Sequence, residues 1–214
     1  ASGGPFLKKS ANKLNKVKIK QAINHPNWKM GKKISIDSAT MMNKVFEIIE
    51  AKKIFNLSYN KLSILIHPKS YVHAIIKFKN GLTKIIVHDT NMKIPIFNSL
   101  YSSNHFINSR ELNLKTLNKL ELKNIDYMRF PVVKILNTLP EESSLYESVL
   151  VIVNDYLVSK FLNNEINFRK LINMTNKISN LKEFQKFKKI KPKNVRDIYT
   201  LRDYVSLKMN SLGI

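Results

Sequence analysis

The chain has 214 residues, a formal net charge of +22 and no cysteine. This length fits one large domain or two small ones, and it allows about 70% of the surface of the unfolded chain to be buried. Without cysteine there are no disulfides, no zinc–thiolate site and no thiol nucleophile. The longest apolar runs are far shorter than the ~20 residues of a membrane helix, so we expect a soluble protein with no membrane partner.

The positive charge suggests nucleic-acid binding, because lysine and arginine release counterions from a phosphate backbone. The excess is mostly lysine, however, and it accompanies many asparagines and isoleucines, which indicates a drift toward A/T-rich codons. The lysine-rich stretches "NKLNKVKIK" and "EFQKFKKIKPK" lack the interleaved aromatic residues of a base-stacking platform. A basic nucleic-acid-binding module therefore remains an alternative hypothesis, and we expect no nucleic acid as the main partner.

The first predicted elements are a loop and a helix. Residues 7–33 contain "NHPNWKMGKK", in which Pro26 and Gly31 break regular structure. We expect a long loop here, of the kind that often forms a lid over a site. A helix is predicted to follow from about Ser38 to Phe55, with Asp37 or Ser38 as its N-cap.

The next segments predict a mainly antiparallel sheet. "KLSILIHP" has the pattern of a strand, and "YVHAIIKFKNGLTKIIVH" contains two strand-like runs joined at Asn80 and Gly81. This dipeptide suits the type I′ turn of a β-hairpin. On the first of these runs His73 shares a face with two lysines, which predicts an exposed position rather than a metal ligand. His67 stands at the end of a strand, and its role stays open.

The second half of the chain is predicted to be helical. After about Ile94 a linker-like stretch contains one further strand candidate, "KLELKN". From Phe130 onward four amphipathic segments indicate a small bundle: "PVVKILNTL", "SLYESVLVIVNDYLVSKFL", "FRKLINMTNKIS" and "VRDIYTLRDYVSLKM". The fold class is therefore α+β, an antiparallel-rich sheet with helices followed by a C-terminal four-helix bundle. We divide the chain into an α/β domain at 1–100 with its lid loop at about 3–33, a linker at 101–128 and the bundle at 129–214.

The helix from Ser38 carries the clearest chemical candidates. At 100° per residue, with Asn43 as zero, Glu47 falls at about 40° and Lys44 at about 100°. These side chains share one arc, and the ordinary interpretation is the solvated face of an amphipathic helix. The other interpretation is a site, because the helix start "SIDSATMMNK" offers hydroxyls and a positive dipole end to a phosphate. Lysine would add charge, and glutamate could bind a divalent cation.

Three further residues could contribute to such a site. His25 and Trp28 lie in the expected lid, and Ser2 stands before two glycines whose backbone could bind an anion. A single histidine or tryptophan is more often structural. The chain contains neither G-x-G-x-x-G nor G-x-x-x-x-G-K-[ST], so it carries no recognisable nucleotide-binding unit.

Several separated motifs occur together: "ASGGPF", "HPNWKMGKKISIDSATMMNK", Glu47 with "IEA", "IHPKSYVH" and "NMKIPI". In this combination and order the sequence closely resembles the 1-deoxy-D-xylulose 5-phosphate reductoisomerase family. The family implies a Rossmann domain for NADPH, a central catalytic α/β domain and a C-terminal helical bundle. By this resemblance the chain holds part of the catalytic domain and the bundle, and the N-terminal Rossmann domain and two acidic metal ligands are absent.

The resemblance also implies roles for individual residues. Lys44 and Glu47 would be catalytic, Glu47 would bind both metal and substrate, and Gly31 would lie near NADPH. Trp28 in the lid, with Met92 opposite, would close over the substrate. The substrate-binding residues, mostly around the phosphate, would be Ser2, His25, Ser38, Asn43, Lys44 and Glu47.

The implied enzyme is an NADPH-dependent reductoisomerase of the non-mevalonate isoprenoid pathway. It converts 1-deoxy-D-xylulose 5-phosphate to 2-C-methyl-D-erythritol 4-phosphate with Mg²⁺ or Mn²⁺, which polarises substrate oxygens before hydride transfer. The family further implies a homodimer as the full-length enzyme, in a bacterial cytoplasm or a plastid-type organelle. We expect this chain to be inactive alone. Two stretches depart from the family: "VIVNDYLV" replaces a usual "NAANE"-like segment, and "VHDTN" precedes Met92. A third hypothesis is an interaction bundle formed by the C-terminal helices.

Overall fold

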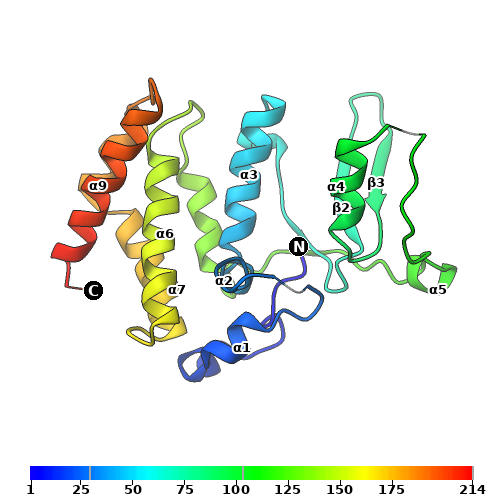
Figure 1. Cartoon of the computed structure of the whole chain (residues 1–214), viewed down its shortest axis with the longest axis horizontal. Helices are drawn as coiled ribbons and strands as arrows, with labels where there is room; N and C mark the ends of the chain where they lie inside the picture. Colours follow the sequence, from blue (N-terminus) through cyan, green and yellow to red (C-terminus); the bar gives the residue numbers. More distant parts are fainter. Residues whose placement is uncertain (29, 103, 214) are drawn as a thin grey trace.

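The computed structural model of the protein describes residues 1–28, 30–102 and 104–213. Figure 1 shows a group of long helices beside a smaller part that contains a β-hairpin. The α+β class with small antiparallel sheets is confirmed. Lys29 of the predicted lid loop and Ser103 of the predicted linker lie outside the described residues. Within the described residues, no helix combines the length and hydrophobicity that crossing a bilayer requires.

The N-terminal part is more helical than the sequence analysis predicts. Its elements are η1 (Ala11–Lys16), α1 (Ile19–Ile23), α2 (Lys32–Thr40), α3 (Met42–Phe55) and η2 (Tyr59–Lys61). Two short helical elements, η1 and α1, therefore interrupt the expected loop at 7–33. The first turn of α1 is held by Gln21, whose side-chain oxygen accepts a hydrogen bond from the Lys18 N–H at 3.1 Å.

The prediction of one helix from Ser38 to Phe55 is wrong, because the chain turns sharply at Met41. Ser38 lies in the last turn of α2, and α3 begins at Met42. Met41 has a φ of 69°, in the left-handed region that residues with a Cβ seldom occupy. Its side chain is fully buried, and this packing supports the turn. The apolar pattern runs through both helices, so it gives no sign of the break.

Two small antiparallel sheets follow. In the first, β1 (Leu65–Ile66) pairs with β4 (Lys123–Asn124), so both predicted strands exist but are short. The second is the hairpin of β2 (Val72–Lys77) and β3 (Thr83–Val87), with Ile75 opposite Ile85.

The predicted type I′ turn of this hairpin is wrong. Gly81 has a φ of 89°, but Asn80 lacks the positive φ that this turn needs. Instead the Gly81 N–H donates to the Phe78 carbonyl at 3.2 Å, and the Phe78 N–H donates to the Leu82 carbonyl at 2.9 Å. The connection is therefore longer than a two-residue turn, and Gly81, not Asn80, takes the left-handed conformation.

The second half contains the predicted helices and several missed ones. The segments expected to be helical form η3 (Pro131–Thr138), which is a 3₁₀ helix, α6 (Tyr146–Leu162), α7 (Phe168–Ser179) and α9 (Val195–Ser211). Short elements between them are α8 (Lys182–Gln185) and η4 (Lys186–Lys189). The linker-like stretch also contains α4 (Lys93–Leu100) and α5 (Leu114–Leu117).

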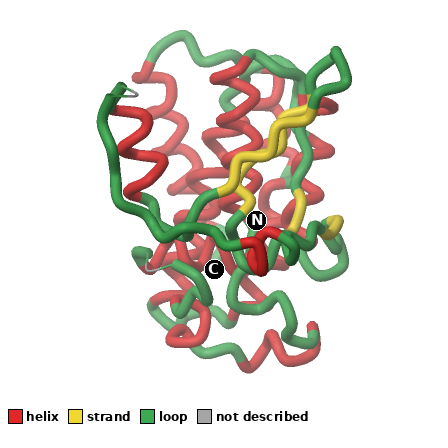
Figure 2. Tube along the Cα trace, turned by 90° about the vertical axis from the view of Figure 1, so that its right-hand side faces the viewer, coloured by secondary structure: helices red, strands yellow, loops and turns green. Residues whose placement is uncertain are grey.

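One hydrophobic core connects the N-terminal helices with the bundle. It extends from Phe6 to Met209 and includes the inner faces of α3, α6, α7 and α9. In this core the rings of Phe6 and Phe168 meet edge to face at 5.0 Å. Helix α2 contacts α6, and α3 contacts η3. Figure 2 looks onto the side that carries the sheets, where the strands lie in front of the helices. In Figure 1, α3 lies between the bundle and the hairpin.

Candidate functional site

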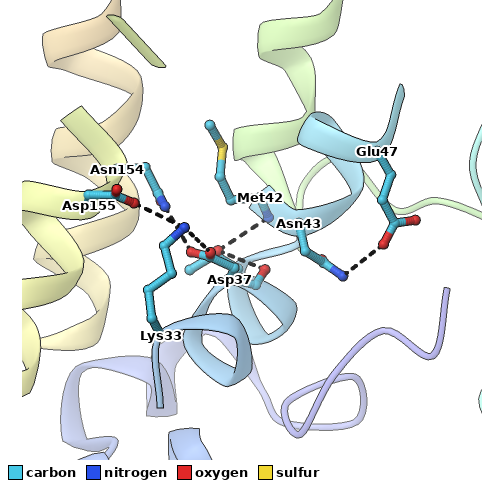
Figure 3. Close-up of polar contacts among 8 residues, drawn as sticks. Lys33, Asp37, Met42, Asn43, Glu47, Asn154 and Asp155 are labelled. Carbon is cyan, nitrogen blue, oxygen red and sulfur yellow. Dashed lines mark hydrogen bonds and ion pairs between the residues drawn. The ribbon is translucent and has the colours of Figure 1, made fainter. Parts of the chain in front are cut away.

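The first two turns of α3 carry a cluster of polar side chains. The ammonium nitrogen of Lys44 lies 2.5 and 2.7 Å from the two carboxylate oxygens of Glu47. The amide nitrogen of Asn43 lies 3.5 Å from one of the same oxygens (Figure 3). Positions three and four apart share one face of a helix, so the structure confirms that these three side chains gather on one arc.

Lys44 and Glu47 stand in the wall of a cavity between α3 and the two sheets. The cavity has a volume of about 270 Å³, close to the lower limit for small-molecule sites. The side chain of Glu47 is 51% exposed and that of Lys44 is 24% exposed. The other lining residues come from the N-terminus, α3, the β1 and β2 segments and the residue before β4: Ala1, Ile48, Ala51, Leu62, Ser63, Ile64, Leu65, His67, Val72, His73, Ala74, Ile75 and Leu122.

Ser2 and His25 form a hydrogen-bonded pair close to Lys44. Nδ1 of His25 accepts from the N–H groups of Asn27 and Trp28, at 3.1 and 3.0 Å. In the neutral ring the proton is therefore on Nε2, which donates to the Ser2 hydroxyl at 3.1 Å. Burial lowers the pKa of His25, and the positive charge of Lys44 lowers it further. At neutral pH this pair is uncharged and lies beside a cation.

A glycine places Ser2 next to the α2–α3 turn. Gly4 has a φ of 65°, and a Cβ there would come within 2.5 Å of the Ser38 carbonyl oxygen and 3.0 Å of the Ala39 Cα. Its N–H donates to the Ser2 hydroxyl at 3.0 Å. The N-terminal segment can thus lie directly on the last turn of α2. Ser38 itself is buried there.

The loop that carries Trp28 is attached to the start of the hairpin. The side-chain amide of Asn27 donates to the Pro68 carbonyl at 2.7 Å and to the Ser70 hydroxyl at 2.9 Å. The Trp28 ring meets His73 edge to face at 6.1 Å. These contacts bring the predicted lid residue to the side of the cavity that the hairpin forms.

The ring of His73 contacts two other rings, those of Trp28 and His88. The His73 ring stacks on His88 with centroids 3.5 Å apart. Although the residue as a whole is exposed, its ring is partly covered by Trp28 and His88. This burial lowers the pKa of His73, and repulsion from the positive charges of protonated His88 and of Lys44 lowers it further, to about 4.

Two predicted site residues stand apart from this cluster. Gly31 is exposed at the N-cap of α2, where its carbonyl accepts from the Ser35 N–H and hydroxyl. Met92 is 53% exposed at the start of α4. The aromatic neighbour of Trp28 is His73, so the structure gives no contact for the expected Trp28–Met92 pair among its described residues.

Sequence reasoning missed two histidines that line the cavity. His67 is buried, and its Nδ1 lies 2.8 Å from the Glu121 carbonyl oxygen. His73 is the extra residue at a β-bulge between Val72 and Ala74. Because a bulge shifts the alternation of side chains, counting back from Lys77 and Lys79 does not give the face of His73. The signal that could have found both is the motif "IHPKSYVH", which contains them.

The donor set fits a hard divalent cation in part. Among the described residues, no group of three or more His, Cys, Asp or Glu could hold an ion. Glu47 offers a carboxylate, and beside it the amide oxygen of Asn43 is buried without a hydrogen-bond partner among the described residues. Such oxygen ligands suit Mg²⁺. This chain would therefore supply one side of a metal site.

Two family models match the chain. Residues 1–55 match the 1-deoxy-D-xylulose 5-phosphate reductoisomerase C-terminal domain, and residues 88–205 match the DXP reductoisomerase C-terminal domain. The chain is 60% identical to the 1-deoxy-D-xylulose 5-phosphate reductoisomerase of Pelagibacter ubique (strain HTCC1062), over 100% of this chain and 55% of that protein. It is 38% identical to that of Wolbachia pipientis wMel, over 99% and 52%.

Solved structures give the same relationship. A crystal structure of DOX-P reductoisomerase in complex with NADPH, fosmidomycin and magnesium is 30% identical with a TM-score of 0.88, over 99% of this chain and 53% of that one. The NADPH complex from Zymomonas mobilis is 27% identical with a TM-score of 0.82, over 99% and 54%. These matches do not support the nucleic-acid alternative. The chain spans about half the length of its relatives, and it belongs to the 1-deoxy-D-xylulose 5-phosphate reductoisomerase family.

Proposed function

We propose that this chain supplies the substrate face and the helical bundle of an NADPH-dependent enzyme that converts 1-deoxy-D-xylulose 5-phosphate to 2-C-methyl-D-erythritol 4-phosphate. The observation that carries the proposal is the Lys44–Glu47 pair in the wall of the cavity, with the Ser2–His25 pair close to Lys44. It combines a cation, neutral hydrogen-bond donors and a carboxylate. This is the chemistry that a phosphosugar and a divalent cation require.

In the proposed site the phosphate end of the substrate binds near Lys44. The ammonium group of lysine is a compact charge with three donors. The Ser2 hydroxyl accepts from the His25 ring and from the Gly4 N–H, so its own proton can be donated to a phosphate oxygen. The Nε2–H of neutral His25 can donate to the phosphate when a phosphate oxygen replaces Ser2 as its acceptor. The Asn43 amide and the Ser38 hydroxyl, next to the α2–α3 turn, extend this set of contacts toward the substrate hydroxyls.

Glu47 is the metal ligand that this chain would provide. When Lys44 turns toward the substrate, the carboxylate of Glu47 is released to bind Mg²⁺ or Mn²⁺ and a substrate hydroxyl. A bound divalent ion supplies a Lewis acid that polarises carbonyl and hydroxyl oxygens. The remaining ligands and the NADPH-binding Rossmann domain would come from outside this chain.

The other roles follow from the same proposal. Trp28 closes the cavity as a lid with Met92 moving opposite it, and Gly31 approaches NADPH. Residues 1–100, with the lid at about 3–33, act as part of the catalytic domain. Residues 101–128 connect this part to the bundle at 129–214. The full-length enzyme works as a homodimer in the bacterial cytoplasm.

The test compares the chain alone with a full-length form. Here the full-length form means this chain joined behind the N-terminal half of the Pelagibacter ubique relative. With 1-deoxy-D-xylulose 5-phosphate and Mg²⁺, we expect the full-length form to oxidise NADPH, followed by absorbance, and the chain alone to give no turnover. A folded full-length form without turnover would contradict the proposed function. Metal-dependent turnover by the chain alone would contradict the division of the site between the two halves.

A further inference from the structure

A buried polar network joins α2 to α6 behind the site. The side-chain amide of Asn154 on α6 donates to Oδ1 of Asp37 on α2 at 2.8 Å (Figure 3). Asp37 and Asn154 are both almost completely buried, at 0% and 2% exposure. They are 117 residues apart in the sequence. This hydrogen bond is therefore a specific tertiary contact between the N-terminal helices and the bundle.

Lys33 completes the network from the surface side. Its ammonium nitrogen lies 2.9 Å from Oδ2 of Asp37 and 3.0 Å from Oδ1 of Asp155, the residue after Asn154 (Figure 3). Burial raises the pKa of Asp37, while the Asn154 amide and the Lys33 ammonium oppose this rise. A buried carboxylate is costly unless it is paired. Apolar side chains could fill the same space without that cost, so packing alone does not explain the network.

The same turn of α2 controls the position of the site. The main-chain carbonyl of Asp37 accepts from the Thr40 hydroxyl at 3.2 Å, and this hydroxyl accepts from the Met42 N–H at 3.3 Å. Met42 is the first residue of α3, and Lys44 follows two positions later. The backbone of Gly4 rests on the next residue of the turn, Ser38.

We propose that Asn154 is a positioning residue for the substrate face. Through Asp37 it fixes the last turn of α2, and thereby the direction of Lys44 on α3 and the place of Ser2. A hydrogen bond at 2.8 Å sets both distance and orientation, whereas apolar packing allows a helix to slide. This inference rests on the proposed function, because its kinetic consequence is a displaced Lys44.

The first test is a double-mutant cycle in the full-length form. Asn154→Leu keeps the number and branching of the side-chain heavy atoms but leaves Oδ1 of Asp37 without its donor. We expect kcat/KM for the sugar phosphate to fall roughly tenfold or more, with the KM for NADPH unchanged. In a Lys44→Ala background the same change should have little further effect, because residues that act through one another are not additive. Asn154→Ser serves as the second variant if Asn154→Leu does not fold.

A matched control separates positioning from general destabilisation. Leu201→Ala removes a buried side chain from α9, on another part of the bundle. At equal loss of stability it should leave kcat/KM and its coupling to Lys44 unchanged. Equal effects of the α6 and α9 variants, or full additivity with Lys44→Ala, would overturn the proposal.

Hydrogen exchange provides a readout that does not depend on turnover. We expect the amides of residues 42–44 to exchange faster in the Asn154 variant than in Leu201→Ala of matched stability. Unchanged exchange at 42–44 would overturn the inference even in an inactive protein. If the unsubstituted full-length form is inactive but the amides of residues 42–44 exchange faster in the Asn154 variant, only the proposed function is contradicted.

Discussion

The ammonium group of Lys44 contacts both carboxylate oxygens of Glu47, one turn further along α3. Both side chains are partly exposed, and such pairs contribute only about 0–1 kcal/mol to stability. The pair is therefore easily opened. An anion near Lys44 and a cation near Glu47 would each replace one partner, so the two ligands should favour each other's binding.

Lys44→Ala should lower kcat/KM of the full-length form by at least about 30-fold. Removing a charged donor from a partly dehydrated site leaves its anionic partner unpaired, which costs about 2–5 kcal/mol. The measurement is steady-state NADPH oxidation over a range of substrate concentrations. Lys160→Ala is the matched control, since Lys160 is also 24% exposed and also paired with a glutamate, Glu165, at 2.5 Å. Equal and negligible effects would make the Lys44 face an ordinary solvated surface.

Glu47→Gln should weaken the response to the metal while leaving the fold intact. The substitution keeps size and hydrogen bonding but removes the negative charge that a divalent cation needs. We expect the Mg²⁺ concentration for half-maximal activity to rise by about tenfold or more, in line with the loss of a metal-site group. Glu165→Gln is the control. An unchanged Mg²⁺ dependence would show that Glu47 is not a ligand.

His25 should make the free energy of unfolding depend on pH in the acid range. Its pKa is lowered in the folded protein, by burial first and then by Lys44, so protonation is easier in the unfolded chain. The stability that the neutral ring contributes is present above the unfolded value of about 6.5 and is lost as the pH falls below it. Urea unfolding between about pH 5 and pH 8 should show a weaker pH dependence for His25→Gln.

The control for this measurement is His105→Gln, at an exposed residue. This change should leave the pH dependence of unfolding as it is in the parent chain. If His25→Gln and the parent lose stability in parallel on acidification, His25 is not the group responsible.

Gly4→Ala should destabilise the protein more than Gly81→Ala. Both glycines have positive φ, at 65° and 89°, so each substitution carries backbone strain of about 1–2 kcal/mol. Only at Gly4 would the new Cβ also clash with backbone, at 2.5 Å from the Ser38 carbonyl oxygen, whereas at Gly81 it meets nothing within 4 Å. Urea unfolding of both variants gives the difference directly. Equal losses would mean that the N-terminal segment does not lie on α2 in solution.

The parts of the fold with strong local patterns could be predicted from the sequence. The hairpin and the helices at 146–162, 168–179 and 195–211 follow from alternation and helical periodicity. Helix α4 was missed because Pro95 suggests a loop, although a proline is tolerated in the first turn of a helix. The break at Met41 was missed because the apolar pattern continues through it.

The candidate site could likewise be predicted from the sequence only where a local pattern exists. The arc of Asn43, Lys44 and Glu47 follows from helical geometry alone. The Ser2–His25 pair joins residues 23 positions apart in irregular segments, for which no periodicity exists. The Asn154–Asp37 contact joins two helices of different halves, and one sequence does not say which polar residues of two helices will meet.

The edge-to-face contact of Phe6 with Phe168 also has a consequence for synthesis on the ribosome. Some 160 residues separate the two rings that meet in the core. At ~5–20 residues per second, the first partner waits roughly ten seconds or more for the second. Throughout that interval the nascent chain exposes the apolar N-terminal surface that α7 covers in the folded protein. A translational pause before residue 168 would lengthen the exposure and favour capture by chaperones, whereas a pause after α7 has emerged would not.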